Sequence, residues 1–243
     1  QNHYGELVAF DRNLGVFRGE LKKMGISKNT ILWFCSDNGG LKKIQPETVG
    51  GLKGFKGSLW EGGIRVPAII EWPSIIKHKI TSFPASTMDI FPTIADILGL
   101  TESDIQGPID GISLLSIFNS NIDKRNSPIP FRIDDKGALI DNNFKLVATS
   151  REEFKFELYD LQADPKETND ISSVNQDKFQ ELITSYLNWN NSVDRSVEGK
   201  DYKEGHLLPQ PERHFWMKDD RYIPYMEELI RRPEYEERIK KAR

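Results

Sequence analysis

Two neighbouring side chains offer oxygen ligands directly after an apolar run of the sequence. Asp37 supplies a carboxylate and Asn38 an amide oxygen, and residues 30–36 before them read Thr-Ile-Leu-Trp-Phe-Cys-Ser. Hard oxygen donors of this kind suit Ca²⁺ or Mg²⁺ better than zinc. Two ligands are too few for calcium, which takes roughly six to eight oxygens, so other groups must complete such a site. Taken alone, Asp-Asn-Gly is also typical of a plain turn, and both interpretations stay open.

A lysine stands in the glycine-rich segment that follows. Lys56 is framed by Gly54 and Gly57. Its ammonium group could be directed at an anionic ester, where it would stabilise charge that develops in the transition state. A solvated loop lysine is the alternative. The segment lacks the Gly-Lys-Ser/Thr ending of a Walker loop and the GxGxxG pattern of dinucleotide-binding proteins, which excludes both nucleotide interpretations.

The same segment carries an acid and a base on either side of a Gly-Gly-Ile tripeptide. These residues are Glu61 and Arg65. An acid–base role for Glu61 is one hypothesis, but we favour a salt bridge to Arg65 that fixes the glycine turn in front of a buried strand. The one cysteine, Cys35, excludes an intramolecular disulfide and a multi-cysteine zinc site. Its apolar surroundings predict an inert residue.

The elements that position these residues follow the order of helices and strands typical of a layered α/β domain. Apolar residues recur at helical spacing over residues 4–24. Residues 30–36 are apolar on both faces, which is typical of a strand buried on both sides in a parallel sheet. A second buried strand is predicted over residues 66–72 and a helix over residues 86–98. Functional groups gather just past the carboxyl ends of strands in such sheets, where the carboxylate and amide pair stands.

The pattern of predicted helices and strands changes at about residue 124. Residues 138–140 and 144–147 are predicted strands joined by an Asp-Asn-Asn turn. Another strand is predicted over residues 156–161, and an amphipathic helix over residues 179–187. We therefore expect a small antiparallel sheet with one packed helix after the α/β part.

Composition and charge exclude several classes of function. The 243 residues include 37% hydrophobic side chains, enough for a sizeable core. With 33 Lys+Arg against 37 Asp+Glu, the formal charge of −4 gives no electrostatic reason to expect binding to nucleic acid or to an anionic membrane. No apolar run approaches the roughly 18 residues of a membrane span, and no signal-peptide pattern stands at the start. The oligomeric state does not follow from the sequence.

The joint order of seven segments resembles the second half of the formylglycine-dependent arylsulfatases, members of the alkaline-phosphatase-like superfamily. The most specific are Ser-Asp-Asn-Gly at residues 36–39 and Gly-x-Lys-(x)₄-Glu-Gly-Gly-x-Arg-x-Pro at residues 54–67. The resemblance covers about residues 4–200. The remaining similar segments are residues 21–25, 88–94, 110–115, 157–161 and 164–168.

The resemblance implies a fold and a division into parts. Residues 1–123 would form the C-terminal half of the catalytic domain, an α/β fold with part of an alkaline-phosphatase-like sheet sandwiched by helices. Residues 124–200 would form a small antiparallel β subdomain with a packed helix. Residues 201–243 would be a C-terminal extension.

The resemblance also implies an activity and a site. Asp37 and Asn38 match the pair that holds the catalytic Ca²⁺ in sulfatases, and Lys56 matches the lysine that contacts the sulfate group. The implied reaction is hydrolysis of aryl or carbohydrate sulfate esters with formylglycine and calcium. A sulfated small molecule or a sulfated carbohydrate would be the substrate, and a periplasmic or secreted location is expected. In the same family, Glu61 and Arg65 occupy positions that look structural.

The sequence departs from the family pattern in two respects that matter for catalysis. The formylglycine of sulfatases arises within a Cys/Ser-x-Pro-x-Arg motif, which is absent here, and Cys35 is followed by Ser-Asp-Asn instead. The aspartate pair that completes the calcium site is absent too. We therefore expect a C-terminal portion of a sulfatase that is inactive alone. Two alternatives are a phosphodiester or phosphonate monoester hydrolase of the same superfamily and a non-catalytic truncated domain.

Overall fold

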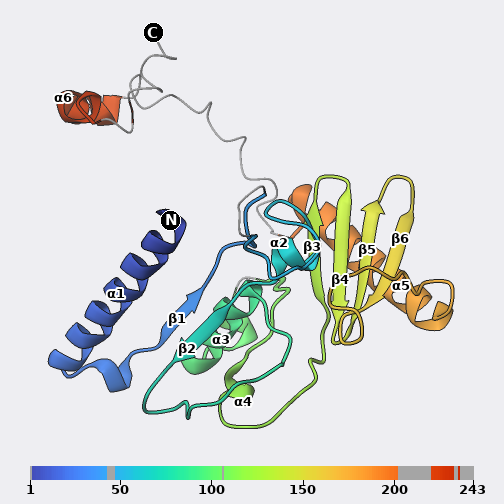
Figure 1. The fold of residues 1–243 in the computed structure, drawn as a ribbon, viewed down its shortest axis with the longest axis horizontal. Helices are drawn as coiled ribbons and strands as arrows, with labels where there is room; N and C mark the ends of the chain where they lie inside the picture. The colour runs from blue at the N-terminus through green and yellow to red at the C-terminus, as the bar shows by residue number, and fades with distance from the viewer. Residues whose placement is uncertain (1, 43–46, 106, 202–219, 233–234, 236–243) are drawn as a thin grey trace. The chain divides into compact units, whose positions relative to one another are not determined.

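A computed structural model describes residues 2–42, 47–105, 107–201, 220–232 and 235 of the chain. Two compact units are present, Gln1–Ser192 and Val193–Arg243, and each is described by itself. Figure 1 shows the order of the helices and strands along the chain.

The first unit opens with a helix and a pair of strands. The helix α1 (Asn2–Lys23) coincides with the helix predicted over residues 4–24. The strands β1 (Leu32–Cys35) and β2 (Ala68–Glu71) form a two-stranded sheet. Both predicted strands are therefore present.

The direction and burial of this strand pair differ from the prediction. β1 and β2 are antiparallel, with Leu32 opposite Glu71 and Cys35 opposite Ala68. Every residue of β1 is only half-buried, so a parallel strand covered on both faces was the wrong expectation for the described pair. An apolar run indicates that its side chains are buried on folding, but it carries no information on strand direction. The run nevertheless ends where the sequence placed it, just before Asp37.

Short helices and 3₁₀ turns lie before, between and after the strands β1 and β2 in the first unit. The helices are α2 (Glu61–Ile64), α3 (Ile90–Ile97) and α4 (Leu115–Phe118), with 3₁₀ turns at Ser27–Asn29, Thr87–Asp89 and Glu102–Asp104. α3 with its preceding 3₁₀ turn corresponds to the helix predicted over residues 86–98, and Gly99 ends it with a φ of +69°. One hydrophobic core of this region has four buried members: Phe83, Leu114, Ile117 and Phe118.

A buried ion pair connects the start of α3 to the segment that leads into the second sheet. The Arg125 guanidinium donates from Nη1 to Asp89 Oδ2 at 2.7 Å and from Nη2 to Asp89 Oδ1 at 2.8 Å. The backbone N–H of Ser86 also donates to Asp89 Oδ2, at 2.8 Å. Both charged side chains are at most 1% exposed. This bidentate pair satisfies two charges that would be costly to bury alone.

A four-stranded antiparallel sheet with a packed helix completes the first unit. Figure 1 shows α5 (Gln176–Val197) lying across one face of this sheet. The strands pair in the order β3-β4-β5-β6, so the predicted hairpin, the predicted third strand and the packed helix are confirmed, and one strand is added at the edge. Their bounds are β3 (Ile129–Ile133), β4 (Lys136–Asp141), β5 (Phe144–Ser150) and β6 (Lys155–Asp160).

The packing of α5 on the sheet follows from alternation in the strands and helical spacing in α5. One face of the strands and one stripe of the helix meet in a single core. Its buried members are Leu139, Leu146, Ala148, Leu158, Leu182 and Tyr186.

The second unit contains a 3₁₀ turn, Asp220–Tyr225, and the helix α6 (Met226–Ile230). Of the C-terminal extension expected over residues 201–243, residues 202–219, 233–234 and 236–243 lie outside the described residues, and α6 lies in the described part. Within the described part of the chain, none of the helices combines the length and the apolar character needed to cross a membrane.

Candidate functional site

The residues after β1 form a tight, internally bonded loop. The Ser36 hydroxyl donates to the carbonyl of Asn38 at 2.9 Å, and the Asn38 amide Nδ2 donates to the carbonyl of Gly39 at 2.9 Å. Asp37 is exposed and Asn38 half-buried. The loop therefore fixes the backbone that carries both predicted oxygen ligands, and it also orients the Asn38 amide.

Lys56 stands at the tip of a turn made by the glycine-rich loop, residues 50–63, which we call the glycine loop. The Ser58 hydroxyl donates to the carbonyl of Phe55 at 2.8 Å and accepts from the N–H of Phe55 at 3.1 Å, which closes the turn around Lys56. Gly54 enters this turn with a φ of +83°, and a Cβ there would lie 2.4 Å from Ser58 Oγ. Only glycine adopts this positive φ without strain and also leaves room for the Ser58 hydroxyl. The side chain of Lys56 is exposed at this tip.

The two loops are bonded directly to one another through their backbones. The N–H of Lys56 donates to the carbonyl of Gly40 at 2.8 Å, and the N–H of Gly39 donates to the carbonyl of Gly63 at 2.8 Å. The contact is so close that a Cβ on Gly39 would lie 1.9 Å from the carbonyl oxygen of Gly62. Asp37, Asn38 and Lys56 are thus brought together on adjoining loops.

The functional groups of these three residues are available for a ligand. Within the described residues, no hydrogen bond or ion pair engages the Asp37 carboxylate, the Asn38 Oδ1 or the Lys56 ammonium. A carboxylate and an amide oxygen suit a hard divalent cation, so this donor set fits calcium chemically. No group of three or more His, Cys, Asp or Glu side chains among the described residues could hold a metal ion. An ion held here would take its remaining ligands from other groups.

Glu61 lies at the opposite end of the glycine loop and is buried. Its Oε2 is 3.8 Å from Nη1 of Arg65, so the favoured salt bridge is present but long, and the Arg65 side chain is 60% exposed. The shorter contact is to Lys145 of β5, whose Nζ donates to Glu61 Oε1 at 2.9 Å. The Lys145 side chain is fully buried. Glu61 is therefore enclosed by structure rather than presented to a substrate.

Glu167, in the turn after β6, completes this buried cluster. Its Oε1 forms an ion pair with Lys145 Nζ at 2.7 Å, and its Oε2 accepts the backbone N–H of Glu61 at 2.7 Å. Burial raises the pKa of the Glu167 carboxyl, while the neighbouring Lys145 ammonium opposes that rise. We name Glu61, Lys145 and Glu167 the buried charge cluster.

Sequence reasoning missed Lys145 and Glu167 as partners of the glycine loop. One signal was present, because Lys145 interrupts the otherwise apolar strand Phe-Lys-Leu-Val, and a lysine on the buried face of a strand requires a carboxylate partner. The identity of that partner does not follow from spacing, since Glu61 is 84 residues away in the sequence.

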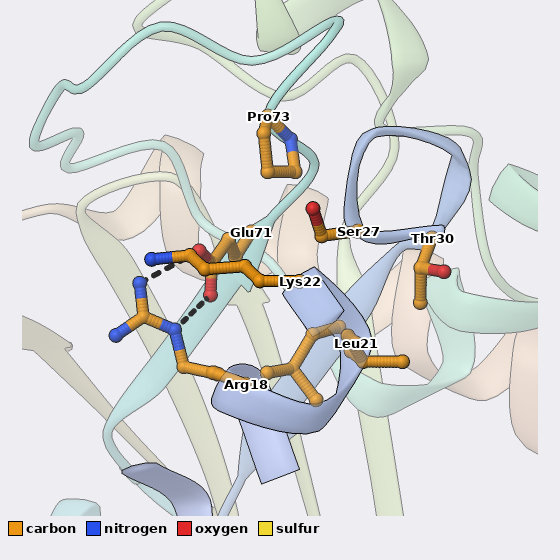
Figure 2. A pocket seen from close by; sticks show the side chains of 8 residues that line it. Arg18, Leu21, Lys22, Ser27, Thr30, Glu71 and Pro73 are labelled. Carbon is orange, nitrogen blue, oxygen red and sulfur yellow. Dashed lines mark hydrogen bonds and ion pairs between the residues drawn. The ribbon is translucent and has the colours of Figure 1, made fainter. Parts of the chain in front are cut away.

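A small cavity lies at the other end of the β1–β2 pair and does not belong to this site. Figure 2 shows its lining, where the Arg18 guanidinium is bonded to the Glu71 carboxylate at 2.7 Å. Glu71 pairs with Leu32, at the start of β1, whereas Asp37 follows the end of β1. The cavity volume is about 20 Å³, room for one water molecule and no substrate.

Two family models match the chain. The model described as "Sulfatase" matches residues 1–100, and the model described as "N-sulphoglucosamine sulphohydrolase, C-terminal" matches residues 54–192. The second match alone covers more than half of the chain, and the two overlap on the glycine loop.

Curated relatives and solved structures agree with these matches. Steryl-sulfatase of Mus musculus is 33% identical over 129 residues, which is 49% of this chain and 20% of that protein. A sulfatase of Formosa agariphila is 32% identical over 196 residues, 71% of this chain and 34% of that protein. The solved structure of Ps i-CgsB in complex with k-i-k-neocarrahexaose is 29% identical, with a TM-score of 0.66 over 75% of this chain and 41% of that one.

These likenesses confirm the fold class that the sequence predicted, an alkaline-phosphatase-like α/β fold followed by a small antiparallel sheet with a packed helix. They also show that the chain spans between about one fifth and two fifths of the length of these relatives.

Proposed function

Because this chain belongs to the sulfatase family, we propose that it forms the part of a sulfuric ester hydrolase that carries Asp37, Asn38 and Lys56. One observation supports this proposal above the others. Three side chains of complementary chemistry lie on two loops that are hydrogen-bonded to each other, and their functional groups have no partner within the described residues. Groups held in place without internal partners are suited to bind a ligand.

Each residue has a definite chemical task in this proposal. The Lys56 ammonium attracts an anionic sulfate group and stabilises the negative charge that develops on the bridging oxygen as the ester bond breaks. Asp37 and Asn38 would hold Ca²⁺ through their carboxylate and amide oxygens. When present, the calcium ion supplies a Lewis acid for the sulfate oxygens, and the formylglycine implied by the family supplies the nucleophile. Glu61 keeps the loop in place and takes no part in proton transfer, because its carboxylate is buried against Lys145.

The proposed substrate is a sulfated carbohydrate or a sulfated small molecule. The carbohydrate class is supported by the likeness to Ps i-CgsB, whose structure contains k-i-k-neocarrahexaose, and the small-molecule class by the likeness to steryl-sulfatase. Export to the periplasm or the cell exterior remains our prediction, which fractionation of cells that produce the full-length protein would test.

A comparison of matched esters tests the proposed reaction against its alternatives. The full-length protein that contains this chain is assayed with 4-nitrophenyl sulfate, 4-nitrophenyl phosphate and a phenylphosphonate monoester. We expect the highest kcat/KM with the sulfate ester. A higher value with a phosphorus ester would favour the phosphodiester or phosphonate monoester hydrolase, and no turnover of any ester would favour the non-catalytic domain.

A further inference from the structure

The glycine loop is held from two sides, and only one of them is the loop after β1. On its other side the loop rests on the four-stranded sheet. The ring of Trp60 packs edge-on against that of Tyr159 in β6, with ring centroids 5.7 Å apart. The Lys53 ammonium lies 3.4 Å from the centre of the Trp60 ring and donates to the carbonyl of Glu167 at 3.1 Å. The antiparallel sheet therefore supports the loop that carries Lys56.

The buried charge cluster is the strongest part of this support. The side chains of Glu61, Lys145 and Glu167 are at most 6% exposed, so water does not compensate their charges. A single ammonium serves both carboxylates, at 2.9 Å and 2.7 Å. Such a cluster tolerates little displacement, because any shift leaves a buried charge without its partner.

A short series of bonds leads from this cluster to the candidate site. Glu167 Oε2 accepts the N–H of Glu61, the first residue of α2. The next two residues reach the site loops: the N–H of Gly62 donates to the carbonyl of Lys53 at 2.7 Å, and the carbonyl of Gly63 accepts the N–H of Gly39. A displacement of Glu61 is thus transmitted to both loops.

We propose that Lys145 and Glu167 are positioning residues for the site, which they serve by fixing Glu61 and hence the relative placement of Lys56 and the Asp37–Asn38 pair. The proposal rests on the proposed function, since positioning matters only if these residues act on a substrate. It assigns the small antiparallel sheet a role in the chemistry of the α/β part, although neither Lys145 nor Glu167 needs to touch the substrate.

A matched pair of variants separates positioning from a general loss of stability. Glu167→Gln neutralises an acid of the buried charge cluster. Asp89→Asn neutralises a buried acid outside this cluster, whose ion-pair partner Arg125 also donates to the carbonyls of Ser127 and Pro84. Both changes replace a buried carboxylate by an amide, and both are expected to lower the thermal midpoint of unfolding.

The first readout is amide hydrogen exchange in the full-length protein, which does not depend on catalysis. In Glu167→Gln we expect the N–H groups of Lys56, Gly62 and Gly63 to exchange at least 10-fold faster than in the wild type, and in Asp89→Asn to stay at the wild-type rate. Equal protection in both variants, or equal acceleration in both, would overturn the proposal. If Glu167→Gln does not fold, Glu61→Gln replaces it, since the amide keeps an oxygen toward Lys145. The same acceleration of amide exchange is then expected in Glu61→Gln.

The second readout is turnover of 4-nitrophenyl sulfate per folded molecule. We expect kcat/KM to fall at least 10-fold in Glu167→Gln and to remain within threefold of the wild type in Asp89→Asn. Lys56→Ala serves as the reference for the proposed function. If Lys56→Ala is inactive while Glu167→Gln has wild-type kinetics, positioning is refuted and the function stands. If Lys56→Ala has wild-type kinetics, the proposed function fails, and the exchange experiment still decides whether the cluster holds the loop.

Discussion

At the residue scale, the candidate site depends on three functional groups that have no partner within the described residues: the Asp37 carboxylate, the Asn38 Oδ1 and the Lys56 ammonium. The Asn38 amide illustrates how this is achieved. Its Nδ2 is used to donate to the carbonyl of Gly39, which leaves Oδ1 as the group available to a ligand. Asp37 beside it contributes a carboxylate that is exposed. Both available groups are oxygens, as a hard cation requires.

Calcium dependence is the first prediction at this scale. Treatment of the full-length protein with EGTA is expected to abolish hydrolysis of 4-nitrophenyl sulfate, and added CaCl₂ is expected to restore it. Asp37→Asn should require a higher calcium concentration for half-maximal activity, because it removes a charged ligand. Asp123→Asn, at an exposed acid without a partner in the described residues, is the control. Undiminished turnover in EGTA would contradict the calcium assignment.

The contact between the two loops yields a second prediction. In Gly39→Ala the added Cβ would lie 1.9 Å from the carbonyl oxygen of Gly62, so the loops must separate. We expect the free energy of unfolding to fall by about 1–3 kcal/mol, measured by urea denaturation. Gly19→Ala is the matched change in open space, since a Cβ there meets nothing within 4 Å and the residue lies inside α1. The free energy of unfolding of Gly19→Ala should rise by up to about 1 kcal/mol. A Gly39→Ala variant as stable as the wild type would refute the close approach.

At the scale of elements, the turn between β6 and α5 presents Glu167 to the glycine loop. Asp164 holds this turn together: its Oδ2 accepts the N–H groups of Thr168 and Asn169 at 2.6 Å and 2.8 Å. Burial acts to raise the pKa of the Asp164 carboxyl. The pKa nevertheless lies below its usual range, because these N–H groups stabilise the charged form. Glu167 itself has a φ of +54° in this turn.

The lowered pKa of Asp164 predicts a pH dependence. A carboxyl whose pKa is lower in the folded than in the unfolded state contributes stability above the unfolded pKa, and that contribution is lost as the pH falls through the folded pKa. Asp164→Asn should therefore have a lower thermal midpoint than the wild type at pH 7. The difference should shrink below about pH 4, the usual value for an aspartate. A difference that is constant from pH 7 to pH 3 would show that the charge of Asp164 does not stabilise the turn.

The elements also show what could be predicted from the sequence. Periodicity located α1, both strands of the first sheet, the β4–β5 hairpin and the packed helix, because each is determined by side chains close together in the chain. It did not predict the antiparallel direction of β1 and β2, nor the edge strand β3, which contains a proline at residue 130. Strand direction depends on the path of the connection, and a proline within a strand weakens its sequence signal.

The sequence likewise predicted some residues of the candidate site and its support, but not others. Asp37, Asn38 and Lys56 were selected from their motifs, and the structure brings their loops together. Their roles in metal and sulfate binding remain predictions. Lys145 and Glu167 could not be assigned, because a buried ion pair between distant segments depends on tertiary packing.

At the scale of the whole molecule, the sequence carries the three proposed binding residues and lacks the nucleophile motif of sulfatases. No Cys/Ser-x-Pro-x-Arg motif occurs in the sequence. The isolated 243-residue chain is therefore expected to show no turnover of 4-nitrophenyl sulfate in the presence of calcium. Measurable turnover by this polypeptide alone would mean that another residue acts as the nucleophile.

The most direct test of the central claim is the kinetic effect of Lys56→Ala in the full-length protein. If Lys56 stabilises charge in the transition state of sulfate ester hydrolysis, kcat for 4-nitrophenyl sulfate should fall roughly 100- to 1,000-fold. The thermal midpoint should stay unchanged, because the exposed ammonium has no partner within the described residues. Lys136→Ala, at an exposed lysine in β4, should leave both quantities at wild-type values. Wild-type turnover by a correctly folded Lys56→Ala protein would contradict the account.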